Sequence, residues 1–181
     1  MPKTIIAPLS FKNEDLTQFA ENAAEKLGLP MVIKESYGSF GFQVYKAHDI
    51  YDAVEIANNI SPNQMIFQEY IKESCGRDVR LNVVGDRVVA SMKRENNNDF
   101  RANVTNGGNM KKYTPTKEEC EIAVSACKAL GLDFGGVDLL FGKDGPLLCE
   151  VNSNAHIKNI LDCTGINVAD EIFSYIKGKL S

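Results

Sequence analysis

The sequence predicts an α+β fold with two sheets. Apolar runs of strand length precede segments of helical period, and this order occurs twice along the chain. Turns rich in glycine and aspartate, Gly85-Asp86 and Gly142-Lys-Asp-Gly145, each separate two such runs and favour β-hairpins. At 181 residues the chain suits one domain or two tightly joined subdomains, and no linker marks a boundary.

Strands and helices are expected to alternate in the first part of the chain. Asn13 is a suitable N-cap for a helix that ends before Gly28, and Pro62 limits the helix that follows. The expected strands are Lys3–Pro8, Met31–Ser36, Phe42–Lys46 and Gln64–Ile71, and the expected helices are 13–27 and 49–61.

The second part of the chain is organised around hairpins. Thr116-Lys-Glu-Glu119 has the spacing of a capping box and predicts a helix start. Residues 93–112 lack periodicity and residues 153–158 are polar, so both segments predict surface loops. The expected strands are Val79–Val84, Arg87–Met92, Gly135–Phe141 and Pro146–Asn152, and the expected helices are 116–130 and one from about Asn167.

The composition favours a cytoplasmic protein. The net charge of −4 gives no electrostatic case for a nucleic-acid partner. There is no signal peptide and no long apolar span, so no membrane partner is expected. The five cysteines form no CxxC pair and are expected to be reduced thiols. The sequence leaves open whether the chain forms a homo-oligomer.

Polar side chains interrupt the apolar strands of the second hairpin. Side chains alternate across a strand, so Glu150 and Asn152 share a face, and the hairpin can hold them beside Asp138. Carboxylate and amide oxygens are ligands that suit Mg²⁺, with water and substrate phosphates completing the shell. The alternative is an ordinary surface, with Asp138 in water at a strand end and Glu150 paired with a lysine.

A lysine and a glycine turn form another candidate site. Lys34 lies in a strand just before Tyr37, Gly38, Ser39 and Gly41. Glycines let backbone N–H groups approach phosphate oxygens closely, and a nearby lysine supplies a point charge. The turn lacks the Walker pattern, and a bare hairpin turn is an equal alternative.

A strand end and a set of basic residues complete the candidates. The end of the strand at residues 68–71 can offer backbone groups to an adenine, with Asp78 accepting ribose hydroxyls, or it can simply reach the surface. Arginine forks match carboxylate and phosphate geometry. The basic set comprises Arg80, Lys93, Arg94 and Arg101, with Asn103 beside it.

Together these motifs resemble the ATP-grasp superfamily, and more closely its RimK-like carboxylate–amine ligases. The resemblance runs from Lys3 to about Ile176. It rests on Val32-Ile-Lys34-Glu-Ser, Gln68-Glu-Tyr-Ile-Lys72, Gly76-Arg-Asp78-Val-Arg80, Phe100-Arg101-Ala-Asn103, Gly136-Val-Asp138-Leu-Leu and Glu150-Val-Asn152-Ser. It implies one ATP-grasp domain over residues 1–181. A lid-type subdomain (1–71) and a catalytic, metal-binding subdomain (72–181) would grip the nucleotide with antiparallel sheets.

The resemblance implies a role for each candidate residue. ATP would be the cofactor, together with Mg²⁺, for which Mn²⁺ can substitute. Cofactor binding falls to Lys34, Tyr37, Gly38, Ser39 and Gly41 at the phosphates, to Gln68, Glu69, Tyr70 and Ile71 at adenine, and to Asp78 at ribose. Catalysis at the phosphate or acyl phosphate falls to Arg80, Arg101 and Asn103, and metal binding to Asp138, Glu150 and Asn152.

The implied reaction joins a carboxylate to an amine at the expense of ATP. The carboxylate first becomes an acyl phosphate, and the amine then displaces phosphate to give an amide. Glutamate is the amino acid that the resemblance favours, and the carboxylate acceptor is unknown. Two alternatives remain: an ATP-grasp kinase that phosphorylates a small molecule, and a nucleotide-binding fragment without activity of its own.

The sequence departs from the family pattern in two places. The family has an N-terminal domain and a helix with a further phosphate-binding lysine before the segment that resembles Pro2–Pro8. We therefore expect this chain to be the ATP-grasp portion of a longer protein. Asn152-Ser-Asn-Ala-His156 stands where the ribosomal-protein glutamate ligases usually have Asn-Ser/Ala-Ser-Pro-Gly. This leaves the acceptor open, and His156 belongs either to a different acceptor pocket or to a solvated loop.

Overall fold

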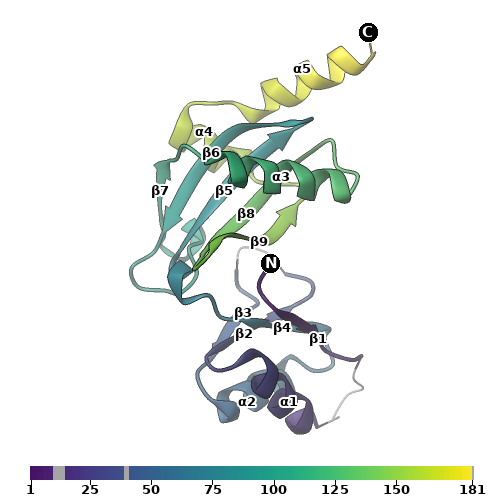
Figure 1. Ribbon diagram of the computed structural model, residues 1–181, viewed down its shortest axis with the longest axis vertical. Helices are drawn as coiled ribbons and strands as arrows, with labels where there is room; N and C mark the ends of the chain where they lie inside the picture. Colours follow the sequence, from purple (N-terminus) through teal and green to yellow (C-terminus); the bar gives the residue numbers. More distant parts are fainter. Residues whose placement is uncertain (10–14, 39–40, 181) are drawn as a thin grey trace. The chain divides into compact units, whose positions relative to one another are not determined.

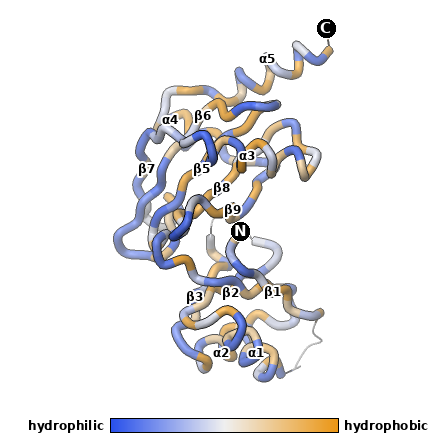
Figure 2. The backbone as a smooth tube through the Cα atoms, viewed as in Figure 1, coloured by the Kyte–Doolittle hydropathy of each residue, from blue (hydrophilic) through white to orange (hydrophobic). Residues whose placement is uncertain are grey.

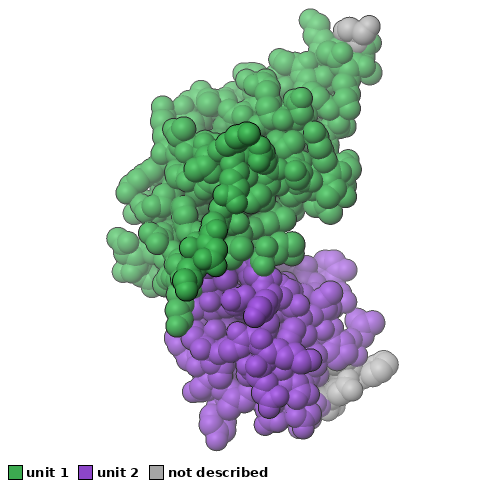
Figure 3. Space-filling model, viewed as in Figure 1, with its two compact units in different colours: residues 1, 72–181 green, residues 2–71 purple. Residues whose placement is uncertain are grey.

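The computed structural model describes residues 1–9, 15–38 and 41–180, which fold into two compact units (Figure 1). One unit comprises residues 2–71 and the other comprises residue 1 with residues 72–181, drawn in purple and green in Figure 3. Each unit has its own antiparallel sheet, of four and of five strands respectively. The predicted α+β fold with two sheets is therefore confirmed.

The smaller unit combines its four-stranded sheet with two helices. Its elements are β1 (Thr4–Ile6), α1 (Thr17–Leu27), β2 (Met31–Glu35), β3 (Val44–Ala47), α2 (Ile50–Ile60) and β4 (Met65–Glu69). The strand order is β1-β4-β2-β3, and each neighbouring pair is antiparallel. Strand β3 begins at Val44 rather than at the predicted Phe42.

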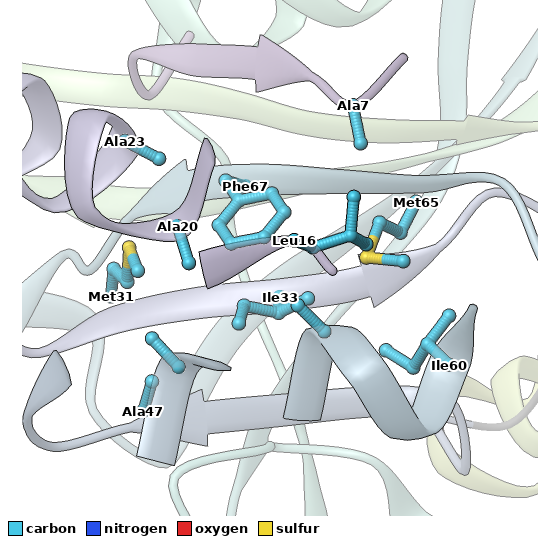
Figure 4. Close-up of a cluster of buried hydrophobic side chains, with 12 residues drawn as sticks. Ala7, Leu16, Ala20, Ala23, Met31, Ile33, Ala47, Ile60, Met65 and Phe67 are labelled. Carbon is cyan, nitrogen blue, oxygen red and sulfur yellow. The ribbon is translucent and has the colours of Figure 1, made fainter. Parts of the chain in front are cut away.

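Helices α1 and α2 pack on one face of this sheet. Ile33 of β2 and Phe67 of β4 are fully buried there among alanines of the helices, as the close-up in Figure 4 shows. Phe67 meets Phe19 of α1 edge to face, with 5.2 Å between the ring centroids. Because side chains alternate along a strand, Lys34 and Gln68 project from the opposite face.

The larger unit is built on a five-stranded sheet of order β7-β6-β5-β8-β9. Its strands are β5 (Arg77–Val84), β6 (Arg87–Glu95), β7 (Asn109–Lys112), β8 (Phe134–Gly142) and β9 (Gly145–Asn152). Its helices are α3 (Lys117–Ala129), α4 (Ile157–Thr164) and α5 (Val168–Leu180), with short 3₁₀ turns at η1 (Lys72–Ser74) and η2 (Val104–Asn106). In the described part of the chain, no helix is long and apolar enough to cross a bilayer.

The two faces of the larger sheet have different coverings. Helix α3 packs on one face, where Leu81 and Val137 belong to the buried cluster (Figure 1). Helices α4 and α5 pack against part of the other face, where Ile160 and Val168 meet Met92 of β6. Figure 2 shows apolar, orange stretches along β5 and β8 and a largely hydrophilic, blue β7. The second face also bears the polar side chains of Asp78, Arg80 and Asp138.

The β5–β6 hairpin contains a β-bulge between its turn and its polar residues. Asn82 pairs with Ala90, whereas a regular ladder from the turn would pair it with Val89. One extra residue on a strand moves every later side chain to the other face. Beyond the bulge, Arg94 therefore lies directly opposite Asp78.

The β8–β9 hairpin contains a second bulge, which also lies between the turn and the polar residues. Its extra residue is Cys149, because Leu139 pairs with Leu148 and the next residue, Asp138, pairs with Glu150. A regular ladder would place Cys149 opposite Asp138 and turn Glu150 to the face covered by α3. The bulge thus puts both acids on one face.

Two of the predicted loops contain regular structure. Within residues 93–112, β6 continues to Glu95 and β7 pairs with it, so the loop prediction was wrong there. An edge strand is held by backbone hydrogen bonds, and the polar residues of β7 give no alternating pattern.

The second predicted loop, residues 153–158, includes the start of a helix that the sequence prediction missed. This helix, α4, begins at Ile157 and has Ile160 as its only buried residue. One turn of apolar spacing is a weak signal for a helix.

The helix starts agree with the sequence in part. The capping box of α3 is confirmed, since Thr116 and Glu119 exchange side-chain-to-backbone hydrogen bonds. Asn13, the predicted cap of the first helix, lies outside the described residues. That helix begins at Thr17, whose backbone N–H donates to Asp15 Oδ1 over 2.9 Å.

Candidate functional site

A connected set of ion pairs lies on the second face of the larger sheet. Asp78 accepts both arms of the Arg94 fork, Nε to Oδ1 over 2.7 Å and Nη2 to Oδ2 over 2.6 Å. The same Nη2 donates to Oδ2 of Asp138 over 2.9 Å. Asp138 also accepts from Nε and Nη2 of Arg80, each over 2.6 Å. Arg80 Nη2 lies 3.9 Å from Glu150 Oε1 and so links the pairs to the second acid.

Strand register explains why these side chains meet. Asp78 and Arg94 are direct cross-strand partners, as are Arg80 and Asp138, and Asp138 and Glu150. Cross-strand partners on one face are close enough for direct side-chain contact. Four neighbouring strands, β6, β5, β8 and β9, therefore each place charged residues in one polar cluster, which we call the Asp138 cluster (Asp78, Arg80, Arg94, Asp138 and Glu150).

The charges of the Asp138 cluster do not cancel. Three carboxylates face two guanidinium groups, so the cluster has an excess of one negative charge. Burial raises the pKa of Asp138, but attraction to Arg94 and Arg80 outweighs burial and holds this pKa below its usual value. The pKa of Glu150 is raised, because its carboxylate is partly desolvated and Asp138 lies beside it. Asp78 and Asp138 are each hydrogen-bonded to an arginine, whereas Glu150 lies 3.9 Å from one, so the excess negative charge of the cluster is located at its Glu150 end.

The donor set at that end fits a hard divalent cation. Asp138 is 3 % exposed, whereas the Glu150 side chain is 53 % exposed, so the acidic pair reaches from the sheet to the surface. Asn152 follows on the same face, and its Nδ2 donates to Glu150 Oε1 over 3.0 Å. In the part of the chain that the structure describes, His, Cys, Asp and Glu side chains form no three-membered metal cluster. A cation here would therefore need Asn152 and additional oxygen ligands, as Mg²⁺ commonly does.

In the smaller unit, Lys34 belongs to a polar chain on the face opposite the helices. Its Nζ donates to Gln68 Oε1 over 2.8 Å, and Gln68 Nε2 donates to Thr4 Oγ1 over 2.9 Å. Gln68 is 5 % exposed and has both ends of its amide engaged. A contact between this segment and adenine would therefore depend on backbone groups. Nearby, Glu69 Oε2 accepts from the backbone N–H of Lys3 over 3.1 Å.

Two glycines of the glycine turn lie among the described residues. Gly41 has φ +75°, in the left-handed region. A Cβ added at Gly38 would lie 2.7 Å from Gln43 Oε1. Tyr37 is exposed, and Ser39 lies outside the described residues. Both glycines lie close after the strand that bears Lys34.

The other candidates have local partners. Arg101 forks onto Asp99, with its Nη2 2.7 Å from Oδ2. Asn103 is the N-cap residue of η2, and its carbonyl oxygen accepts from the backbone N–H of Gly108 over 3.3 Å. The ring of Tyr70 lies 4.2 Å from Lys46 Nζ, a cation–π contact. Ile71, the last residue of the unit, is buried.

Arg94 is the functional candidate that sequence reasoning missed. The sequence motifs assign it no role of its own, yet it is the residue that joins Asp78 to Asp138. The hairpin turn at Gly85-Asp86 could have located it, but a regular ladder from that turn predicts Lys93 opposite Asp78. The bulge at Val89 shifts the partner to Arg94, and nothing in the sequence marks the bulge.

Curated relatives with similar sequences are named glutamate ligases. The chain is 46 % identical over 154 residues to "Probable alpha-L-glutamate ligase 1" of Shewanella sp. (strain MR-4), which covers 83 % of this chain and 51 % of the relative. It is 39 % identical over 182 residues to "Probable alpha-L-glutamate ligase" of Legionella pneumophila (strain Corby), covering 99 % of this chain and 58 % of the relative. The chain spans about half the length of these relatives.

Solved structures with a similar fold are ATP-grasp ligases and related enzymes. The D-cycloserine synthetase DcsG superposes with a TM-score of 0.78 at 15 % identity, covering 99 % of this chain and 65 % of that one. The ATP-grasp ligase PsnB, in complex with a precursor variant, Mg and ADP, gives 0.74 at 17 % identity, covering 99 % and 54 %. D-alanine–D-alanine ligase from Bacillus anthracis gives 0.72 at 19 % identity, covering 99 % and 62 %. At these identities the likeness concerns the fold alone.

The family match extends over nearly the whole chain. Residues 2–176 match the family described as the RimK-like ATP-grasp domain, a span that includes both units and every candidate residue above. The two-sheet fold agrees with that of the solved ATP-grasp ligases. The resemblance drawn from the sequence motifs is therefore confirmed, and this chain belongs to the family of RimK-like ATP-grasp domains.

Proposed function

We propose that this chain provides the ATP- and Mg²⁺-binding portion of a ligase that joins glutamate to a carboxylate acceptor through an acyl phosphate. The observation that carries the proposal is the Asp138–Glu150 pair, held on one face of a hairpin beside Arg80. The family, the glutamate-ligase names of the relatives, and the Mg and ADP in the PsnB complex all support it.

In the larger unit, Asp138, Glu150 and Asn152 would hold Mg²⁺, which would neutralise charge on the nucleotide phosphates. A carboxylate has about four lone-pair sites, so Asp138 can accept from both arginines and still ligate a cation. Arg80 lies between the two acids and is the group best placed to bind an anionic phosphate or acyl oxygen. Arg101 and Asn103 remain proposed contacts of the transferred phosphate.

In the smaller unit, Lys34 and the glycine turn would bind phosphate oxygens, and Gln68 would orient the lysine ammonium. Backbone groups of residues 69–71 would contact adenine. The ribose contact predicted for Asp78 remains untested, and its bidentate pair with Arg94 favours a different role for this carboxylate.

These residues would act by positioning and by charge neutralisation. Transfer of the γ-phosphoryl group to a carboxylate needs no side-chain nucleophile, because the substrate carboxylate itself attacks. The amine then attacks the acyl carbon and phosphate leaves, which gives an amide. Holding the reacting groups in near-attack geometry supplies much of the rate enhancement in such reactions.

The test is nucleotide binding by calorimetry with a non-hydrolysable ATP analogue and Mg²⁺. We expect the wild type to bind, and both Lys34→Ala and Glu150→Ala to bind at least tenfold more weakly, because each loses a charge that faces the phosphates or the metal. Lys117→Ala is the matched control, since this lysine is 91 % exposed in a pair with Glu121. Equal affinity in all four proteins would contradict the proposal.

Product analysis separates the alternatives. A ligase should form ADP and amide only when glutamate and a carboxylate acceptor are both present. ADP formation that needs no amine would favour the kinase. Binding without any ADP formation, under conditions where a full-length relative turns over, would favour a fragment that binds nucleotide without catalysis.

A further inference from the structure

Arg94 and Asp78 form a buried pair next to the proposed metal ligands. Arg94 is 4 % exposed and Asp78 is 8 % exposed. Both arms of the fork are used on Asp78, and one arm is shared with Asp138. Burial lowers the pKa of Arg94, but attraction to Asp138 and Asp78 outweighs burial and keeps the guanidinium charged.

Stability alone does not explain such a pair. Taking two charges out of water is costly, and well-packed apolar residues often replace a buried ion pair without loss of stability. The surrounding positions on this face include Ala90 and Met92, so the sheet accommodates apolar side chains there. A different benefit is visible in the geometry: the pair places a fixed donor 2.9 Å from Asp138 Oδ2.

The two arginines on Asp138 differ in how firmly they are held. Arg80 contacts Asp138 and Glu150, and both acids belong to the proposed metal site. Arg94 is also tied to Asp78, so moving it would leave a buried carboxylate without its ion-pair partner, which is strongly unfavourable. Arg80 can therefore turn to an incoming anion, whereas Arg94 stays in place.

We propose that Arg94 and Asp78 are positioning residues for the metal site: Asp78 clamps the Arg94 fork, and Arg94 fixes the carboxylate of Asp138 in the orientation that receives the cation. This inference depends on the proposed function, because it concerns the same metal-binding carboxylates. Partners that orient a metal ligand commonly affect metal affinity nearly as strongly as the ligands do.

The test replaces the pair without leaving an unpaired charge. The double variant Asp78→Leu/Arg94→Met is expected to unfold at a denaturant concentration equal to or above that of the wild type. Its affinity for Mn²⁺ in the presence of ADP, followed by electron paramagnetic resonance, is expected to fall about tenfold or more. Arg94→Lys keeps the charge but loses the fork, and it is expected to give an intermediate loss with an altered Mn²⁺ spectrum.

The matched control is Arg87→Met/Glu171→Leu, which removes an exposed ion pair that also involves β6. We expect it to bind Mn²⁺ as the wild type does.

Three outcomes would contradict the positioning role. If wild type and Asp78→Leu/Arg94→Met bind Mn²⁺ equally while Glu150→Gln does not bind, the positioning role is wrong and the metal site stands. If Glu150→Gln binds as well as the wild type, the metal site and the positioning role fail together. If the double variant does not fold, unchanged Mn²⁺ binding by Arg94→Lys overturns the positioning role.

Discussion

At the scale of single residues, burial and charged neighbours together set the pKa values of the acids on the larger sheet. Asp138 is buried and yet stays ionised, because two arginines donate to it. Glu150 has a raised pKa, because its carboxylate is partly desolvated and lies beside Asp138. Residue type was enough to make these two acids candidates for a site. Their shifted pKa values could not be predicted, because they depend on partners from strands distant in the sequence.

Glu95 provides a pH-dependent test of the same principle. Hydrogen bonds from Lys111 and Lys93 lower the pKa of Glu95 from 4.5 to about 2. A lowered folded-state pKa stabilises the fold above pH 4.5, and this stabilisation is lost as the pH falls from about 4.5 towards 2. Glu95→Gln should therefore cost about 1 kcal/mol or less at pH 7. Its difference from the wild type should vanish near pH 2, as measured by urea denaturation at each pH.

Glu121→Gln serves as the control for Glu95→Gln. Glu121 pairs with Lys117 at 3.4 Å on an exposed helix surface, where an ion pair contributes little. A stability difference between Glu95→Gln and wild type that stays constant from pH 7 to pH 2 would contradict the role assigned to the two lysines.

At the scale of elements, the bulges determine which residues share the polar face. The turns of the β5–β6 and β8–β9 hairpins and the capped helix α3 follow from local sequence signals, and they were predicted. The extra residues Val89 and Cys149 carry no such signal, since each is an ordinary strand former. The sequence prediction that Asp138 and Glu150 share a face is correct only because of a bulge that alternation does not foresee. For the same reason Arg94 was overlooked.

The contact between β8 and the segment after β9 gives a packing prediction. A Cβ added at Gly136 would lie 2.5 Å from the Cβ of Ala155 and 3.9 Å from Cδ of Arg80. Gly136→Ala should therefore destabilise the fold by about 1–3 kcal/mol through overcrowding. Adding Ala155→Gly should recover most of this loss, which a double-mutant cycle by chemical denaturation would measure.

Gly178→Ala is the matched control, because nothing lies within 4 Å of a Cβ at that position in α5. It should be neutral or stabilise the helix by up to about 1 kcal/mol. If Gly136→Ala were as stable as the wild type, the segment after β9 would be able to move aside without loss of stability. If Ala155→Gly did not rescue the variant, crowding against Ala155 would not be the cause of its instability.

At the scale of the whole molecule, the chain consists of two units with independent cores. Each of the three buried clusters in the described residues draws its members from one unit only. The sequence predicted two sheets but contained no linker to mark the division, because the chain passes directly from β4 to η1. Separate cores imply that either unit can retain its structure when the other is absent or unfolded.

A fragment of residues 72–181 tests this independence. Its sheet, three helices and both bulges lie within the fragment, so we expect a cooperative unfolding transition. Its amide cross-peaks in a heteronuclear NMR spectrum should overlay those of the same residues in the intact chain, apart from residues near the cut. Loss of the dispersed spectrum in the fragment would contradict the independence of the two cores.

The bulge at Cys149 also has a consequence for how this hairpin can vary through evolution. Insertions in the Gly142–Gly145 turn leave the pairing of Asp138 with Glu150 intact, so the length of that turn is open to drift. Between Pro146 and Glu150, however, the gain or loss of a single residue would rotate the second acid into the core under α3. An insertion in this interval must therefore be matched by a deletion in the same interval if Glu150 is to stay on the face of Asp138. We expect natural relatives to vary freely in this turn and to keep the number of residues in this short interval constant.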